Sequence, residues 1–316
     1  MQPKVKLQLL AIMSVALVAA FLFAGIGEHW DYVLPKRGIK ILAMVLTGVA
    51  IAFSTMIFQT ITNNRILTPS ILGLDSLYML LQTFMVFAFG STNLTMMSSN
   101  TNFLLSVGLM IFFSGVLYKV LFRGEGQNIY FLLLIGLIVG TFFQSMSTFM
   151  QVLIDPNEFQ IVQDKMFASF NNINTDVLML SMLAFLAVAV YFLRLAKYLD
   201  VLSLGREQAI SLGVDYDYVV KRLLVIVAIL VSIATALVGP ITFLGLLVAN
   251  VAHEFLKTFR HSYLIIGASL ISVIALVGGQ LIVERVFTFS TTLSVIINFV
   301  GGVYFIYLLL RVNKSW

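Results

Sequence analysis

The sequence predicts an all-α, polytopic membrane protein with about ten transmembrane helices. Hydrophobic residues make up 60% of the 316-residue chain and charged residues only 10%, whereas soluble domains carry about 25% charged residues. The mean hydropathy is +1.03. The apolar residues form continuous runs rather than the alternating pattern of a lipid-facing strand, which favours helices over a β-barrel.

The expected spans follow the apolar runs in order, at about 20 residues for each crossing of the bilayer. The first run follows Lys4 and Lys6, as in a signal peptide, but no small-x-small cleavage site precedes Glu28, so we expect a retained span. The eighth run is too short to cross about 30 Å of hydrocarbon and follows Gly239-Pro240, which predicts a broken or partial helix. The ten spans are expected at 7–27, 39–62, 71–90, 103–122, 129–151, 176–196, 222–238, 244–258, 262–281 and 294–311.

The distribution of lysine and arginine predicts how the chain is oriented in the membrane. If both termini are cytoplasmic, fourteen of the 19 basic residues fall on the cytoplasmic side. Because cytoplasmic loops are enriched in Lys and Arg, this excess favours cytoplasmic N and C termini. The inside set is Lys4, Lys6, Arg65, Lys119, Arg123, Arg194, Lys197, Arg206, Lys221, Arg222, Lys257, Arg260, Arg311 and Lys314, and the outside set is Lys36, Arg37, Lys40, Lys165 and Arg285.

The loops on the expected outer side differ in character. Segment 28–40 is mixed in charge, segment 91–102 is rich in Ser, Thr and Asn without charge, and segment 155–176 is acidic apart from Lys165. No low-complexity linker or soluble domain interrupts the chain. We therefore expect residues 1–316 to form a single membrane domain.

The longest charge-bearing break in the second half of the chain, residues 200–222, predicts a pair of short cytoplasmic helices. Residues 202–215 read as an amphipathic helix, in which Gly213 supplies a C-terminal stop because glycine takes positive φ without steric cost. Asp215 is a candidate N-cap for a second short helix through Arg222. The apolar residues of the first helix are Leu204, Ile210 and Leu212, and its charged residues are Arg206 and Glu207.

Several functional classes are excluded by what the sequence lacks. The chain has no cysteine, so disulfides and thiol chemistry are excluded. It has no Gly-Lys-[Ser/Thr] phosphate-binding motif, so it does not hydrolyse nucleotide by that route. His29, His253 and His261 lack metal-ligand spacing, and His261 with Arg260 and Lys257 is interpreted as a basic cytoplasmic loop. We therefore expect no catalytic residue, metal site or cofactor in this chain.

The span interiors hold almost no ionisable residue, which argues against an intramembrane carboxylate relay. If the chain is a transporter, its energy is expected to come from another subunit. An ion-coupled secondary carrier with broken helices remains an alternative, and a membrane scaffold without transport activity is a further one.

Four stretches between about residue 30 and residue 311 stand out as motifs. They are 34–40, Gln59-x-x-x-Asn63-Asn64-Arg65 continuing to Gly73, Glu207-Gln-Ala209-x-x-x-Gly213, and Gly239-Pro-Ile-Thr-Phe-Leu-Gly continuing to Asn250. The third stretch fits, apart from Gln208, the Glu-Ala-Ala…Gly pattern by which permeases of ATP-binding cassette (ABC) importers dock on their ATPase. In order and spacing, the four stretches together resemble the iron-siderophore and vitamin B12 permease family of these importers (FecCD/BtuC-like).

The chain departs from the family pattern at several positions. Asn64-Arg65 replaces Asn-Pro, Leu77-Tyr78 stands where Gly-Ala is common, and Ala249-Asn250 replaces Pro-His. His253 lies where an arginine is frequent. These departures resemble the branch that serves catechol-type and mixed carboxylate–catechol siderophores, often as the second of two different permease chains. Cobalamin, haem and hydroxamate siderophores remain open as cargo.

The resemblance implies a BtuC-like permease of the bacterial cell membrane and a set of partners. These are two ATPase subunits that carry ATP and Mg, a second permease chain, the same or paralogous, and a siderophore-binding lipoprotein or periplasmic protein. The lipid bilayer surrounds the complex, and no nucleic acid is expected. ATPase coupling is assigned to Leu204, Gly205, Arg206, Glu207, Ala209, Leu212, Gly213 and Val214, with Leu204, Ala209 and Leu212 as the packing face.

Two further sets of residues are candidates for function. Lys36, Arg37 and Arg285 are expected to pair with carboxylates of the binding protein, or else to be ordinary interfacial charges. A second set is assigned to the translocation pathway or to helix breaks, with interhelical hydrogen bonding as the alternative for its polar members. It comprises Gln59, Asn63, Asn64, Pro69, Gly73, Gly239, Pro240, Phe243 and Gly245.

Overall fold

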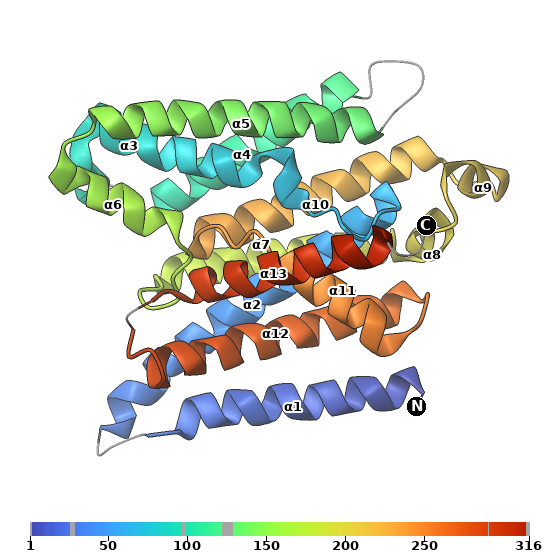
Figure 1. Ribbon diagram of the computed structural model, residues 1–316, viewed down its shortest axis with the longest axis horizontal. Coiled ribbons are helices and arrows are strands. Elements are labelled where there is room, and N and C mark those ends of the chain that lie inside the picture. Colours follow the sequence, from blue (N-terminus) through green and yellow to red (C-terminus); the bar gives the residue numbers. More distant parts are fainter. Residues whose placement is uncertain (1, 26–28, 97–98, 122–128, 290, 314–316) are drawn as a thin grey trace.

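The computed structural model describes residues 2–25, 29–96, 99–121, 129–289 and 291–313. Within these ranges the chain forms thirteen α-helices and a 3₁₀-helix, and no strand (Figure 1). The elements are α1 (Pro3–Phe23), α2 (Trp30–Thr62), η1 (Pro69–Leu72), α3 (Leu74–Met96), α4 (Ser99–Leu121), α5 (Ile129–Leu153), α6 (Pro156–Met166), α7 (Thr175–Leu193), α8 (Ala196–Leu202), α9 (Arg206–Ser211), α10 (Tyr216–Val238), α11 (Leu244–Leu256), α12 (His261–Arg285) and α13 (Leu293–Asn313).

The ten expected spans each correspond to a helix, which confirms the all-α membrane fold. Seven described helices are long and apolar enough to cross a membrane: α1, α2, α4, α5, α7, α10 and α12. Shorter apolar helices occupy the three remaining spans, namely α11, α13 and the part of α3 before its kink at Gly90. The first and fourth spans extend by a few residues into positions outside the described ranges.

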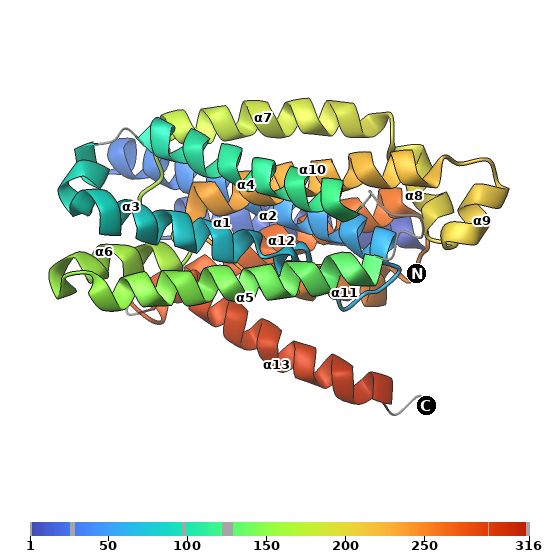
Figure 2. The same cartoon turned by 90° about the horizontal axis from the view of Figure 1, so that it is seen from above.

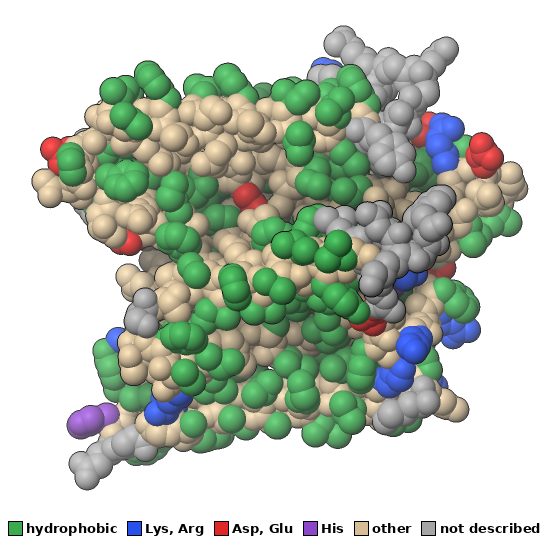
Figure 3. Space-filling model, viewed as in Figure 1, with side chains coloured by type: hydrophobic (Ala, Val, Ile, Leu, Met, Phe, Trp, Pro, Cys, Tyr) green, Lys and Arg blue, Asp and Glu red, His purple; other side chains and the backbone are tan. Residues whose placement is uncertain are grey.

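The long helices run between two ends of the bundle (Figure 1). We call the end that carries α8 and α9 the α9 end, and the end that carries α6 the α6 end. α1 begins and α13 finishes at the α9 end. Figure 3 shows hydrophobic side chains across most of the visible face, with most of the Lys and Arg side chains gathered toward the two ends.

Two helices form the centre of the bundle. In α2 and α10, 78% and 72% of the most apolar window is buried, against 17% in α1 and in α5. α2 packs most extensively against α10 and α12. The peripheral helices leave large apolar side chains exposed, as expected for surfaces that face lipid. α13 diverges from the rest of the bundle and packs mainly against α11 and α12 (Figure 2).

Two interruptions divide the helical bundle, and both involve glycine at positive φ. α10 ends at Gly239, where φ is 102°. α11 has 13 residues and a length of about 20 Å, so the predicted partial helix is confirmed. Between η1 and α3, Gly73 has φ of 78°, and a Cβ placed on it would lie 2.8 Å from the Cα of Gly140 in α5.

Three features of the fold differ from the sequence-based expectation. Tyr216 to Arg222 do not form a separate short helix, because they are the first turns of α10 and no breaker follows Asp215. α6 and α8 are helices where loop or helix end was expected; Asp155 caps α6, and Pro156 occupies its first turn. α2 begins nine residues earlier than predicted and continues through Pro35, which lies in its second turn and leaves one backbone hydrogen bond unmade.

Candidate functional site

The helix expected over 202–215, which carries the predicted coupling segment, is shorter than predicted: it is the six-residue α9, closed by glycines on both sides. Gly205, with φ of 99°, is the N-cap residue of α9. At the other end the N–H of Gly213 donates to Ile210 O at 2.9 Å and the N–H of Val214 donates to Ala209 O at 3.1 Å. This is a Schellman motif, with Gly213 at φ of 81° in the left-handed position. The sequence-based prediction of a glycine stop at this position is confirmed.

The exposed face of the segment is apolar. Leu204, Ile210 and Leu212 are 55%, 47% and 63% exposed. Ala209 is fully buried and packs into the core of its own chain. The expectation that Ala209 lies on the same face as Leu204 and Leu212 is therefore wrong: Ala209 anchors α9 to the bundle, and the third exposed apolar residue is Ile210.

Charged residues fix α9 against the start of α10. Arg206 lies 3.7 Å from Asp217, and its guanidinium is 5.7 Å from the ring centroid of Tyr216. Both members of the ion pair are about half exposed, so the pair contributes at most about 1 kcal/mol. Glu207 is exposed on α9 and free to face a partner.

A chain of hydrogen bonds joins α8 to α2 and α12 behind the coupling segment. Asp200 Oδ1 accepts the backbone N–H of His261 at 2.9 Å and lies 2.6 Å from His261 Nδ1. His261 Nε2 lies 2.8 Å from Thr60 Oγ1. We call Asp200, His261 and Thr60 the α9-end clamp. His261 is 6% exposed, so it is not part of a solvated basic loop, as the sequence suggested.

The charge of Asp200 is favoured by this geometry. Partial burial alone would raise the pKa of its carboxyl, but the backbone N–H of His261, the His261 ring and the nearby Arg260 more than offset burial and lower the pKa. The carboxylate is therefore ionised at neutral pH and accepts both hydrogen bonds from His261.

A small polar cavity lies where the two helix interruptions meet. Its volume is about 20 Å³, enough for one water-sized molecule. Asp75, in the first turn of α3, faces it and accepts a hydrogen bond from Thr235 Oγ1 at 3.1 Å. Gly245 gives the cavity its space, because a Cβ there would lie 2.2 Å from Thr55 Oγ1. The lining residues are Ile51, Ser54, Thr55, Thr68, Pro69, Ser70, Asp75, Val231, Thr235, Ile241, Thr242 and Gly245.

The residues assigned to the pathway or to helix breaks separate into distinct places. Pro69 and Gly245 line the polar cavity, whereas Gly73 lies in an open groove against α5. Gln59 donates to Arg65 O at 2.6 Å, and Asn64 Oδ1 accepts the N–H of Ile66 at 2.9 Å. These bonds hold the loop after α2.

The remaining residues assigned to the pathway or to helix breaks lie at the end of α2 and at the break between α10 and α11. Asn63 ends α2 in the left-handed conformation. Gly239 packs against the backbone at Ala168, and Pro240 follows it. Phe243 packs against Gly301 in α13.

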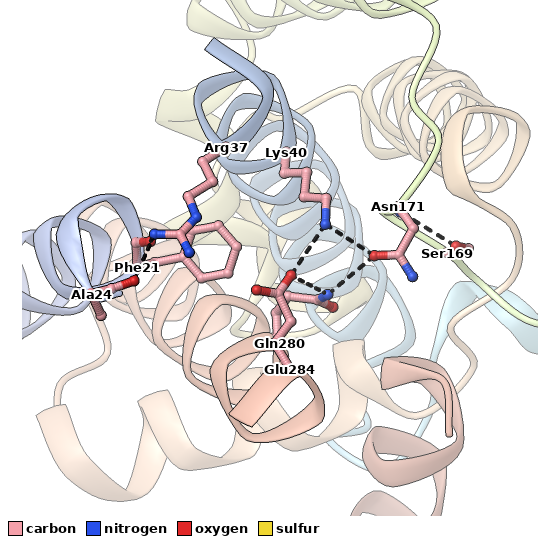
Figure 4. A network of polar contacts seen from close by, with 8 residues as sticks. All are labelled: Phe21, Ala24, Arg37, Lys40, Ser169, Asn171, Gln280 and Glu284. Atoms are coloured by element: carbon pink, nitrogen blue, oxygen red, sulfur yellow. Dashed lines mark hydrogen bonds and ion pairs between the residues drawn. The ribbon is translucent and has the colours of Figure 1, made fainter. Parts of the chain in front are cut away.

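A second polar cluster lies at the α6 end, and Figure 4 shows its members pointing toward one another from α2, α12 and the loop before α7. Lys40 Nζ lies 3.1 Å from Glu284 Oε1 and donates to Asn171 Oδ1 at 3.1 Å. Gln280 donates to Glu284 Oε1 at 3.0 Å. We call Lys40, Asn171, Gln280 and Glu284 the α6-end clamp.

All three residues predicted to dock a binding protein make contacts within the chain. One Arg37 Nη donates to the carbonyl oxygens of Phe21, Leu22 and Ala24 at 2.8–3.0 Å, and so caps the C-terminus of α1 (Figure 4). Arg285 donates to Ala24 O at 2.5 Å. Lys36 bonds to the hydroxyl of Tyr32 and is exposed. Of the three, Lys36 has the most freedom to meet a partner.

Asp75, Asp200 and His261 belong to these sites but are not among the predicted site residues. Asp75 could have been predicted from the sequence, because a lone carboxylate inside an apolar run needs a polar partner. Asp200 and His261 carry no such signal, since each lies in a charged loop region by sequence. Across the described ranges, no three His, Cys, Asp or Glu side chains gather as a group that could hold a metal ion.

Comparison with known proteins identifies relatives over the whole chain. The model of the FecCD transport family matches residues 4–311. The chain is 67% identical over 316 residues to the petrobactin import system permease protein YclO of Bacillus subtilis (strain 168), with full coverage of both chains. It is 40% identical over 279 residues to the petrobactin import system permease protein FatC of Bacillus anthracis, covering 88% of this chain and 79% of FatC.

A solved structure shares the fold. It is described as an inward-facing metal-chelate type ABC transporter, and the two chains superpose with a TM-score of 0.84 at 20% identity, over 98% of this chain and 100% of that one.

Proposed function

The chain belongs to the FecCD transport family, and from this premise we propose that it is the permease subunit of an ABC importer for a ferric siderophore of the petrobactin type. The observation that carries the cargo assignment is the 67% identity over the full length to a petrobactin permease. The protein is a multi-pass protein of the cell membrane and not an enzyme. ATP and Mg bind to a separate ATPase subunit, two copies of which are expected in each complex.

In this proposal the ATPase subunit binds to the coupling segment. Leu204, Ile210 and Leu212 offer exposed apolar side chains on a short helix that Ala209 fixes to the bundle. Burying two leucines that are more than half exposed stabilises an interface by about 1 kcal/mol each. Arg206 and Glu207 surround this face and favour one orientation of the partner. The α9 end is then cytoplasmic, which places both termini inside the cell.

The remaining partners follow from the same assignment. An extracytoplasmic siderophore-binding protein docks at the α6 end, where Lys36 is exposed. A second permease chain, identical or paralogous, completes the pathway. The open groove between η1 and α5, lined by both polar and apolar side chains, is a surface for that chain to face.

Uptake by proteoliposomes that contain the purified complex tests the proposed function. Ferric petrobactin is expected to accumulate only with ATP inside the lumen and binding protein outside, and an imposed ion gradient without ATP is expected to have no effect. Preferential accumulation of haem, cobalamin or a ferric hydroxamate in the same assay contradicts the cargo assignment. Uptake that depends on the ion gradient contradicts the ABC mechanism.

The coupling segment has its own test. Leu204→Asp with Leu212→Asp is expected to weaken ATPase binding by about tenfold or more, because two apolar contacts are lost and charges are introduced. Val286→Asp is the matched control, since Val286 is 70% exposed at the α6 end. Equal binding by the Leu204/Leu212 variant and the control would place the ATPase elsewhere.

A further inference from the structure

The two polar clamps lie at opposite ends of one helix pair. Thr60 and Lys40 are both in α2, separated by about 30 Å along the helix axis, and His261 and Glu284 are both in α12, separated by about 35 Å. Between the clamps the two helices approach closely at Gly48, where a Cβ would lie 2.8 Å from Ser272 Oγ. The pair is thus held at both ends and in the middle.

Each clamp attaches a different element to this pair. At the α9 end, Asp200 attaches α8 to this pair, and α8 leads directly into the coupling segment. At the α6 end, Asn171 attaches the loop 167–174, between α6 and α7, to this pair. The same loop bonds to the end of α10 through Ser169, whose N–H donates to Val238 O at 2.9 Å.

The loop 167–174 also forms part of a polar cavity at the α6 end. Asn172 and Asn174 line this cavity together with Gln82 and Asn102, and its volume is about 120 Å³. Gln82 and Asn102 exchange hydrogen bonds at 3.1 and 3.3 Å across α3 and α4. A displacement of the loop therefore changes the shape of a cavity on the side opposite the coupling segment.

We propose that the α2–α12 pair carries displacement of the coupling segment to the loop 167–174, and that His261 is the positioning residue that fixes α8 to this pair. The inference rests on the proposed function for the source of the displacement. Packed protein interiors are stiff and transmit strain, and hydrogen bonds restrain direction, which apolar contacts do not. Without the α9-end clamp, the remaining contacts of α8 with the bundle, against α2, α7 and α12, are packing contacts that restrain its direction less.

The first test compares transport with ATP hydrolysis in proteoliposomes that contain the full complex and ferric petrobactin. His261→Ala removes the ring contacts but keeps the backbone N–H, and it is expected to lower the siderophore imported per ATP hydrolysed by about tenfold, the equivalent of one lost charge-assisted hydrogen bond. Asp200→Ala removes both hydrogen bonds from His261 and is expected to lower the ratio at least as much. Thr60→Val is expected to act in the same direction, whereas Thr60→Ser keeps the hydroxyl and is expected to behave as the unaltered chain. Lys197→Ala, an exposed change on α8, is the matched control.

A second pair of variants tests whether the clamps act in series. Glu284→Gln weakens the α6-end clamp while preserving its shape, and it is expected to lower the same ratio. Because the two clamps transmit one displacement, the His261→Ala/Glu284→Gln double variant is expected to be no worse than the more severe single variant. Additive losses, or parallel losses of ATPase activity, uptake and thermal stability, would overturn the inference in favour of a purely structural role.

Distances between spin labels test the connection without cargo. The chain has no cysteine, so Ser211→Cys on α9 and Ser262→Cys on α12 label two exposed positions without background. The distance distribution is expected to stay unchanged between nucleotide-free and ATP-trapped complexes with an intact clamp, and to broaden in the His261→Ala background. A shift with the clamp intact, or no broadening in the variant, contradicts the inference. Failure of the unaltered complex to import siderophore would instead refute the proposed function.

Discussion

Gly73 connects η1 to α3 at a point where the backbone of α5 leaves no room for a side chain. Its φ of 78° lies in the left-handed region, and a Cβ would meet Gly140 Cα at 2.8 Å, Gly140 N at 3.0 Å and Gly136 O at 3.1 Å. These are backbone atoms, so no side-chain rotation relieves the overlap. Gly73→Ala is therefore expected to destabilise the fold by about 1–2 kcal/mol through the left-handed conformation and by about 1–3 kcal/mol through overpacking.

The melting temperature of the purified permease in detergent measures this effect. Gly73→Ala is expected to lower it by about 5 °C or more, and to separate α3 from α5 so that Asp75 is no longer held at the polar cavity. Gly108→Ala in α4 is the matched control, since a Cβ there meets no atom within 4 Å, and its melting temperature is expected to equal or slightly exceed that of the unaltered chain. Equal melting temperatures for the two variants would refute the assignment of Gly73 to a close backbone contact.

Three other predictions concern the ends of the bundle and the cavity. Arg37→Ala is expected to cost about 1–3 kcal/mol of stability, because three carbonyl oxygens at the end of α1 lose a charged donor. Lys36→Ala is expected to leave thermal stability unchanged and to lower affinity for the binding protein. The reverse pattern would assign docking to Arg37. Gly245→Val is expected to lower both thermal stability and ATP-driven uptake, since the valine side chain overlaps Thr55 Oγ1. Unchanged uptake would show that transport does not need the cavity. The folded protein lowers the pKa of Asp200 from its usual 3.8. The stabilisation from the Asp200 carboxylate is therefore complete above pH 3.8 and is lost as the pH falls through the lowered pKa. The melting temperatures of the unaltered chain and Asp200→Asn are expected to differ at neutral pH and to converge in acid.

Local patterns in the sequence were sufficient for the main architecture. Continuous apolar runs predicted the ten membrane segments, because a chain in hydrocarbon must satisfy its backbone hydrogen bonds within helices. Gly239-Pro240 predicted the break before α11, and Gly213 predicted the end of α9, because both depend on the backbone preferences of single residues. The amphipathic pattern of 202–215 also predicted the exposed apolar face of the coupling segment.

Contacts between distant residues were outside the reach of such patterns. Ala209 was expected on the exposed face, but α9 turns it inward, since the orientation of so short a helix is decided by the elements beneath it. Arg37 and Arg285 were expected to face a partner, yet both donate to the end of α1, which lies beside them only in the folded bundle.

The sequence by itself determined which segments are apolar enough to cross the membrane, where the helices break and which short stretch exposes an apolar face. Composition, run length and helix breakers are sufficient for these properties because they act within about twenty residues. Only the tertiary structure brought Asp200, His261 and Thr60 together, across separations of 61 and 201 residues. The partner of a buried polar group depends on how the helices pack, and that packing decides how the coupling segment is attached to the rest of the protein.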